Sequence, residues 1–308
     1  MSAIQGRKIT LVGASGGLGS QIVHALQLYG IHTITAITRT ESAAVFPSDV
    51  IVCRGAYSHN RFLVDTLKDQ DVVILVLSFM ALDSQILIIN AAAQAGVPWV
   101  IPCEFAADNL HEKLNQEISM MSQKNKYREY IDQLGVSSWI GIINGPWFDW
   151  SFKKSYWGID VKARKVNIFN GDTKINTTTL RKVGRSLAAL LSLPESELQT
   201  FKNQFVYFSS FLVSQRDILN SVIRATGTEE SDWVIETKDA TKAAEDAKKA
   251  IERGDGMATV DLLFATLNRE GFGGNYEQKV FLNKELELEQ ENFDIVVRKL
   301  VWESESRI

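Results

Sequence analysis

The sequence predicts an α/β protein built on a doubly wound parallel sheet of the Rossmann type. In the first half, short runs of β-branched residues alternate with longer helical patterns, and the first run leads directly into a glycine-rich turn. Such alternation is typical of parallel strands that are joined by crossover helices. The strands expected in this half are Lys8–Val12, Thr33–Ile37, Val50–Cys53, Val72–Leu77, Trp99–Ile101 and Ser138–Ile143.

The turn after the first expected strand indicates a dinucleotide site. Its residues are Gly13, Ala14, Ser15, Gly16, Gly17, Leu18 and Gly19, and an amphipathic helix follows them. In turns of this kind Gly13 makes the tight bend, Gly16 lets main-chain amides approach a pyrophosphate, and Gly19 allows close helix packing. Glycines at such intervals also occur in ordinary structural turns, and the strand before and the helix after favour the dinucleotide.

The end of the second expected strand predicts which dinucleotide binds. Sites that prefer NAD carry an acidic residue there, which accepts hydrogen bonds from the ribose 2′-hydroxyl. In this chain Arg39 comes first and the acidic Glu41 lies beyond it. A guanidinium suits a 2′-phosphate, so we predict NADP(H) rather than NAD as the cofactor. The alternative is a solvated loop arginine without a ligand.

After residue 150 the pattern becomes irregular. We expect an NADP-binding Rossmann domain over residues 1–150 and a smaller, interleaved α+β substrate domain over residues 151–308. No linker rich in Pro, Gly or Ser separates them, so the boundary is blurred and segments near 166–208 are expected to return to the first domain. The elements expected here are a strand, Gln204–Phe208, and the helices Leu180–Leu191, Ser214–Ala225, Thr237–Arg253, Met257–Leu267 and Phe293–Trp302.

Composition excludes several classes of function. The 308 residues are 45% hydrophobic and 23% charged, with a formal net charge of −4, which is ordinary for a soluble globular protein. Scattered Lys and Arg give no field for nucleic acid. No apolar run approaches the roughly 18 residues that span a bilayer, and the N-terminus lacks a signal layout, so we expect a cytoplasmic protein with no membrane partner. Four dispersed histidines and two cysteines show no metal-ligand spacing, so we expect no metal.

Ligands of doubly wound sheets bind beyond the carboxyl ends of the strands. The residues that we expect to contact the cofactor there, after the fourth, fifth and sixth strands, are Ser78, Phe79, Glu104, Asn144 and Pro146. Each exit could equally be an ordinary loop, and their position beside the glycine turn favours a shared site.

A segment dense in aromatic residues follows the sixth strand. It carries six rings between Trp147 and Trp157. We expect most of them to pack between the two halves or at a subunit interface, which leaves a homodimer open, and one or two to line a pocket for a flat apolar substrate.

The Tyr-x-x-x-Lys pair of conventional short-chain dehydrogenases is absent. The helix expected in its place, near Met121–Ile131, carries Lys124 and Lys126 on different faces. At most one of the two lysines can therefore point at the cofactor, and the spacing leaves open which one does.

Together these features resemble the NmrA-like, isoflavone-reductase-like family of atypical short-chain dehydrogenase/reductases, in particular its fungal members. The likeness is carried by the glycine turn, Arg39, Pro102–Phe105, Lys124–Arg128 and Asn144, with Asn176–Thr179 in the second half. It implies an NADP-dependent oxidoreductase of secondary metabolism in which Lys124 is catalytic and also lies at the cofactor. This chain departs from the family pattern at two places: Cys103 stands where the family has serine, and Gly145–Trp147 replaces an Asn-x-Phe motif. From these departures we expect a substrate other than the plant phenylpropanoids of the family.

The leading hypothesis is therefore an NADPH-dependent reductase that transfers hydride to an aromatic or conjugated small molecule, with Lys124 as proton donor or electrostatic catalyst. The alternative is an NmrA-like sensor that binds NAD(P) and a partner protein without catalysis. A weaker third possibility is an NADP-dependent epimerase that recycles its cofactor within the site.

Overall fold

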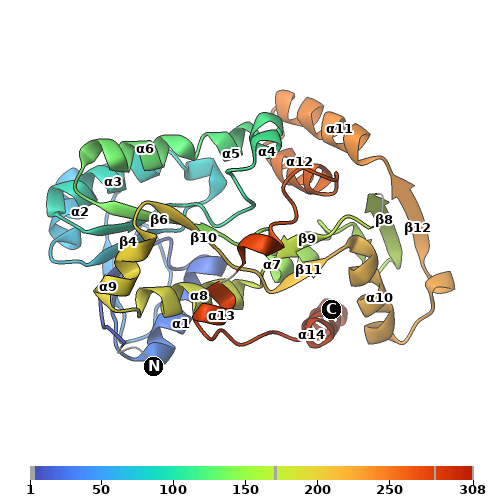
Figure 1. Cartoon of the computed structure of the whole chain (residues 1–308), viewed down its shortest axis with the longest axis horizontal. Coiled ribbons are helices and arrows are strands. Elements are labelled where there is room, and N and C mark those ends of the chain that lie inside the picture. Colours follow the sequence, from blue (N-terminus) through green and yellow to red (C-terminus); the bar gives the residue numbers. More distant parts are fainter. Residues whose placement is uncertain (1–3, 170–171, 281, 307–308) are drawn as a thin grey trace.

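A computed structural model describes residues 4–169, 172–280 and 282–306. Its central sheet has seven parallel strands in the order β10-β6-β5-β4-β1-β2-β3 (Figure 1). In chain order these strands are β1 Lys8–Val12, β2 Thr33–Thr38, β3 Ile51–Arg54, β4 Val72–Leu75, β5 Trp99–Ile101, β6 Ser138–Ile143 and β10 Gln204–Tyr207. The predicted fold class, a Rossmann-type parallel sheet, is confirmed.

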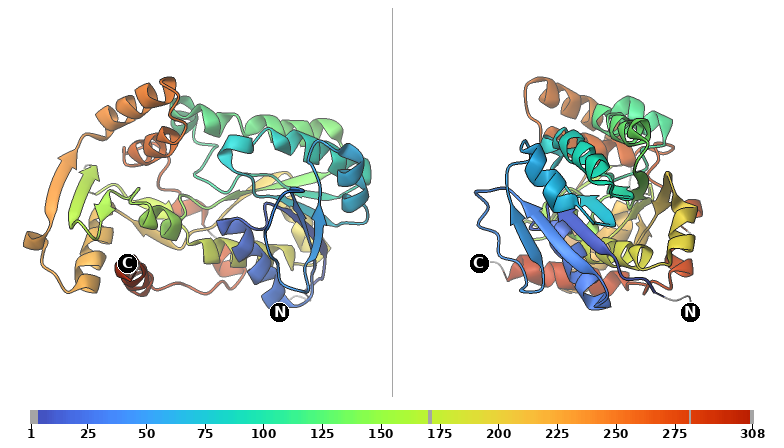
Figure 2. Two further views of the ribbon diagram at one scale, coloured as in Figure 1. Left: turned by 180° about the vertical axis from the view of Figure 1, so that it is seen from behind. Right: turned by 90° about the vertical axis from the view of Figure 1, so that its left-hand side faces the viewer.

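Helices cover both faces of this sheet (Figures 1 and 2). Along β4, Val72 and Ile74 pack in the core beneath one helical layer, and Val73 and Leu75 pack beneath the other. Burial on both faces explains why this strand is apolar throughout. The first layer is α1 Gly17–Tyr29 and α8 Leu180–Leu191, and the second is α2 Asn60–Leu67, α3 Ser84–Ala95 and α6 Asn125–Leu134.

Elements from the second half of the chain also belong to this part of the structure, chiefly β10 and α8. Strand β10 pairs with β6 in parallel and forms one edge of the sheet. Helix α8 packs against α1 at Gly184, where a Cβ atom would lie 2.5 Å from the main-chain oxygen of Gln21. The lack of a side chain at Gly184 is therefore what permits this helix contact.

Most of the remaining second half surrounds a separate core around Phe148, Trp157 and Phe264. Its small sheets are β9-β11, which is antiparallel, and β7-β8-β12. Their strands are β7 Ile159–Asp160, β8 Lys165–Phe169, β9 Ile175–Thr177, β11 Phe211–Val213 and β12 Val234–Lys238. The helices around this core are α7 Phe148–Lys153, α10 Gln215–Thr226, α11 Ala240–Glu252, α12 Ala258–Leu267 and α14 Phe293–Glu305, together with two short helices from the first half of the chain, α4 Glu112–Glu117 and α5 Ser119–Ser122. The short helices α9 Glu195–Leu198 and α13 Leu282–Glu285 pack instead against the core of the central sheet, through Leu198 and Leu282.

The structure corrects two of the predicted helices. The helix predicted over Thr237–Arg253 begins later, because Val234–Lys238 forms β12 and the Asp239 side chain caps α11 by accepting a hydrogen bond from the Lys242 amide. The helix predicted near Met121–Ile131 is interrupted, since α5 ends at Ser122 and α6 begins at Asn125. Among the helices that the structure describes, none has the length and apolar character required to cross a bilayer.

Replacing Gly184 with alanine tests the contact between α1 and α8. The added methyl would press on main-chain atoms, and we expect a net loss of about 1–2 kcal/mol of unfolding free energy despite the higher helix propensity of alanine. Urea denaturation measures this loss. The control is Gly256→Ala, where a Cβ atom would meet nothing within 4 Å; an equal effect in both variants would contradict the packing argument.

His32 predicts a pH dependence of stability. Its Nδ1 accepts a hydrogen bond from the Arg7 amide, and burial together with the Arg7 charge lowers its pKa from 6.5 to about 4. Between these values the unfolded chain binds a proton that the folded chain does not, so stability falls as the pH falls. Because the ring is only half-buried, we expect a contribution of about 1–2 kcal/mol. Urea midpoints should fall less between about pH 7 and about pH 4.5 in His32→Gln than in the natural chain, and parallel curves would contradict this assignment.

Candidate active site

The glycine turn has the geometry of a main-chain cradle. Gly13 has φ +88°, and a Cβ atom there would lie 1.9 Å from the carbonyl oxygen of Val76. A Cβ atom on Gly19 would lie 2.1 Å from the Gly13 oxygen. Both positions therefore require glycine. Ala14 and Leu18 point into the core, while Ser15, Gly16 and Gly17 are exposed.

The N-terminus of α1 suits an anion. No side chain caps this end, and its first turn carries no acidic residue. Unsatisfied amides and the helix dipole give such an end positive character. The turn therefore fits the pyrophosphate of a dinucleotide.

Arg39 follows β2, the strand beside β1, and lies at the same edge of the sheet. Its side chain is 70% exposed and forms a loose ion pair with Glu41, with 3.4 Å between Nε and Oε1. Exposed pairs of this kind contribute little stability, so Arg39 can exchange Glu41 for a phosphate.

The exits of β4 and β5 lie along the same edge. Ser78 is exposed and accepts a hydrogen bond from the Met80 amide, and Phe79 is half-buried. Cys103, after β5, donates its main-chain N–H to Gln85 and its thiol to the Leu77 carbonyl. Desolvation raises the pKa of this thiol, so it stays protonated and is a packed group rather than a nucleophile.

Glu104 is deeply buried, and its carboxylate is occupied by protein partners. One oxygen accepts a hydrogen bond from Arg128, and the other accepts one from Asn109 at 2.6 Å. Its main-chain carbonyl accepts a hydrogen bond from Lys124. A direct contact of Glu104 with the cofactor therefore stays a prediction, while its contacts within the protein are defined.

The two candidate lysines occupy different environments. Lys124 is 5% exposed and donates to the Glu104 carbonyl. Lys126 is half-exposed and pairs with Asp83 at 2.6 Å, a contact that lowers the pKa of the Asp83 carboxyl. Of the two, Lys124 faces the exit of β5, where parallel sheets of this class bind their ligands.

The loop that follows β6 contacts residues of the second half of the chain. Asn144 is buried, its main-chain oxygen accepts a hydrogen bond from the Thr178 hydroxyl at 2.6 Å, and its Oδ1 has no partner among the described residues. The oxygen of Pro146 accepts a bond from the Thr177 hydroxyl at 2.7 Å. Gly145, with φ +66°, permits this contact, because a Cβ atom would lie 2.1 Å from the Asn176 oxygen.

Three of the six aromatic residues after β6 are buried in a core. Phe148, Phe152 and Trp157 are buried in the core of the second half, whereas Trp147, Trp150 and Tyr156 are partly exposed. Trp150 stacks on Tyr156.

One polar cluster at this edge escaped the sequence analysis. Buried Asp108 accepts hydrogen bonds from the Tyr207 hydroxyl at 3.2 Å and from Lys279 at 2.6 Å. Beside it lies a cavity of about 890 Å³, lined in part by His111, Tyr276 and the loop Gly271–Gly274. The cluster joins residues up to 171 positions apart, so no local pattern could have revealed it.

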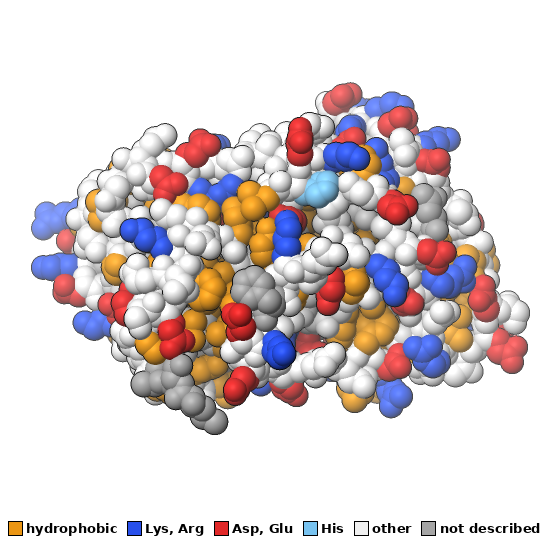
Figure 3. Space-filling model, viewed as in Figure 1, with side chains coloured by type: hydrophobic (Ala, Val, Ile, Leu, Met, Phe, Trp, Pro, Cys, Tyr) orange, Lys and Arg blue, Asp and Glu red, His pale blue; other side chains and the backbone are white. Residues whose placement is uncertain are grey.

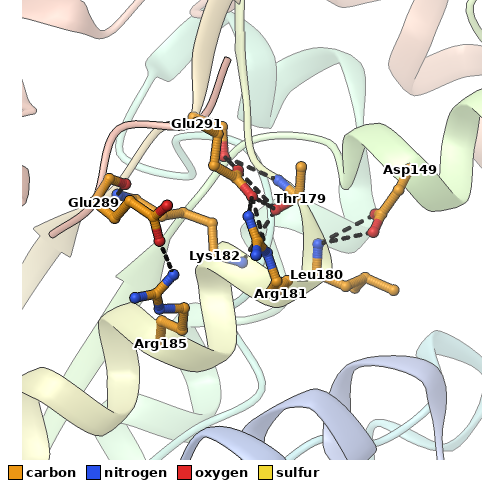
Figure 4. A network of polar contacts seen from close by, with 9 residues as sticks. Asp149, Thr179, Leu180, Arg181, Lys182, Arg185, Glu289 and Glu291 are labelled. Carbon is orange, nitrogen blue, oxygen red and sulfur yellow. Dashed lines mark hydrogen bonds and ion pairs between the residues drawn. The ribbon is translucent and has the colours of Figure 1, made fainter. Parts of the chain in front are cut away.

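The N-terminus of α8 lies near the glycine turn, because a Cβ atom on Gly17 would lie 3.6 Å from the Leu180 side chain. This end of the helix is held by several polar contacts. Three basic residues of its first turns, Arg181, Lys182 and Arg185, hold the segment Glu289–Glu291 (Figure 4). Asp149 accepts a hydrogen bond from the Leu180 amide at 3.1 Å. Contacts from α7 and from the segment before α14 thus brace this helix.

Acidic and basic side chains are intermixed over the face shown in Figure 3. Within the described ranges 4–169, 172–280 and 282–306, no group of three or more His, Cys, Asp or Glu side chains could hold a metal ion.

Residues 5–155 match the profile of the NmrA-like family. The chain is thus similar to the NmrA-like family over its N-terminal half. It is 29% identical over 300 residues to oxidoreductase aprR of Aspergillus flavus, which covers 96% of this chain and 98% of the relative. It is also 29% identical over 279 residues to oxidoreductase poxI of Penicillium oxalicum, covering 86% and 83%. These relatives confirm the predicted resemblance and enzyme class, an oxidoreductase.

The fold of this chain matches solved structures over nearly its whole length. The structure of AtPrR2 with NADP+ and (+)pinoresinol superposes with a TM-score of 0.77 at 18% identity, covering 96% of this chain and 99% of that one. At this identity the likeness establishes the shared fold.

Proposed function

We propose that this protein is an NADPH-dependent reductase that acts on an aromatic or conjugated small molecule. The observation that carries the proposal is Lys124, a buried ammonium that forms no ion pair with any described residue and donates one hydrogen bond to a main-chain carbonyl. Burying a cation without a counter-ion is costly, so such a group is typical of a functional site. Relatives named oxidoreductases and a solved neighbour with NADP+ and (+)pinoresinol support the same function.

Each group of residues at the carboxyl edge of the sheet has its own proposed role in binding or catalysis. The glycine turn and the N-terminus of α1 would bind the pyrophosphate, and Arg39 would pair with the 2′-phosphate. The bound dinucleotide supplies the hydride. Lys124 has two N–H groups beyond the one that Glu104 accepts, and these would donate a proton to the substrate or stabilise the negative charge that develops on it. The cavity beside Asp108 is the proposed substrate chamber, with Tyr276 as part of its wall.

Arg39→Ala tests the cofactor assignment. Loss of a charge-assisted contact worth about 1.5–3 kcal/mol should weaken NADPH binding about 10–100-fold and leave NADH binding unchanged. Titration of tryptophan fluorescence with each dinucleotide measures both affinities. Arg61→Ala, which removes an 87% exposed arginine paired with Asp65, is the matched control. Equal weakening of both dinucleotides, or of neither, would contradict a 2′-phosphate contact.

Lys124→Met tests the chemistry. Without its proton donor the enzyme should lose about 100–10,000-fold in kcat, while NADPH affinity changes less than about threefold. NADPH absorbance is followed with a panel of aromatic carbonyls and enones. Lys126→Met, which removes the half-exposed neighbour, should retain turnover.

Other results of this assay would reject the reductase. Tight NADPH binding without turnover across the panel would favour the sensor. Product formation without net consumption of NADPH would indicate an epimerase.

A further inference from the structure

We propose that Arg128 is a positioning residue, which acts through the Glu104 carboxylate to fix the carbonyl that holds the Lys124 ammonium. The inference rests on the proposed role of Lys124. Its structural part, that Arg128 immobilises Lys124, can be measured without any turnover.

Both cations hold the same residue. Lys124 donates to the main-chain oxygen of Glu104, and Arg128 donates to its side-chain carboxylate. Lys124 precedes α6 and Arg128 lies four positions later, so the two side chains are on the same face of that helix. Glu104 is thus held at two points from one helix.

The guanidinium is itself immobile. Arg128 is 7% exposed, it donates a second hydrogen bond to Asn125, and its guanidinium carbon lies 4.6 Å from the centre of the Phe205 ring. On the other side of Glu104, Asn109 donates to the free carboxylate oxygen at 2.6 Å. Every contact that orients this carboxylate is therefore buried and directional.

The main chain next to Glu104 needs such a restraint. Phe105, which follows it, is buried and has φ +21°. Residues other than glycine rarely adopt positive φ, and they keep it only where their surroundings hold them in place. Release of the Glu104 carboxylate would let this segment relax and turn its carbonyl away from Lys124.

The energetic balance also favours an orienting role. Removing two charges from water is expensive, and replacing a buried ion pair with uncharged residues is often neutral for stability. A fixed direction for the Lys124 amine is a different benefit, because a displacement of about 1 Å at a reacting group can cost about 100-fold in rate.

The experiment compares Lys124 in the natural chain, Glu104→Gln/Arg128→Met, Arg128→Met and Arg128→Lys. The double variant removes both charges of the pair, so it should fold even if Arg128→Met, which leaves a buried carboxylate unpaired, does not. Reductive methylation of Lys124 in the purified full-length protein is followed by peptide mass spectrometry. Arg61→Met serves as the control, since Arg61 is exposed and distant in sequence from the pair.

We expect Lys124 to be methylated at least about tenfold faster in the double variant, with kcat reduced by about 10–100-fold and the KM for NADPH changed less than about threefold. Arg128→Lys should restore part of the protection and of kcat. A purely stabilising role would lower the melting temperature without these changes.

A folded double variant whose Lys124 is as protected as in the natural chain would overturn the proposal. If the natural chain shows no turnover with any substrate, the reductase proposal fails, and the methylation rates still decide whether Arg128 positions Lys124.

Discussion

At Gly13 the main chain passes so close to the residue after β4 that a Cβ atom would lie 1.9 Å from the Val76 oxygen. This contact fixes where the chain leaves β1, and therefore where α1 begins. The helix in turn sets the path of α8, which meets it at Gly184. Two glycines, one in each half of the chain, thus permit two close approaches, that of the glycine turn to the chain after β4 and that of α8 to α1.

The same edge brings together groups with opposite requirements. The glycine turn must leave main-chain amides open to solvent, whereas Lys124 and Glu104 are withdrawn from it. Parallel strands allow this because each exit is an independent loop. The turn after β1 depends on its glycines, which have no side chains. The loop after β5 depends on a buried polar network in which Glu104 contacts Lys124 and Arg128.

Local patterns predicted the fold well and the site in part. Short stretches of sequence were enough to predict the alternation of strands and helices, the glycine turn and the helix Leu180–Leu191. The structure has that helix at the predicted residues. Strand β12, Val234–Lys238, was missed because four of its five residues are exposed and it pairs in parallel with the distant β8. The separation of Lys124 from Lys126 followed from helix geometry, but only the folded chain shows which of them is buried.

Long-range pairing was beyond prediction from local sequence. No periodicity relates Asp108 to Lys279, and the two residues meet only because the loop after β5 crosses the end of β6, where Ala106 bridges to Ile143. Arg128 belonged to a recognisable helix, yet its partner Glu104 lies on another element. Such pairs depend on topology rather than on local propensity.

The placement of β10 and α8 decides whether the first half of the chain could exist alone. The family profile ends at residue 155, and both α8 and β10 lie after that residue in the sequence. A fragment cut at that point would expose the hydrogen-bonding edge of β6 and the apolar flank of α1, both of which invite aggregation. The half that is proposed to bind the dinucleotide therefore depends on β10 and α8 to cover its sheet edge and its helix flank.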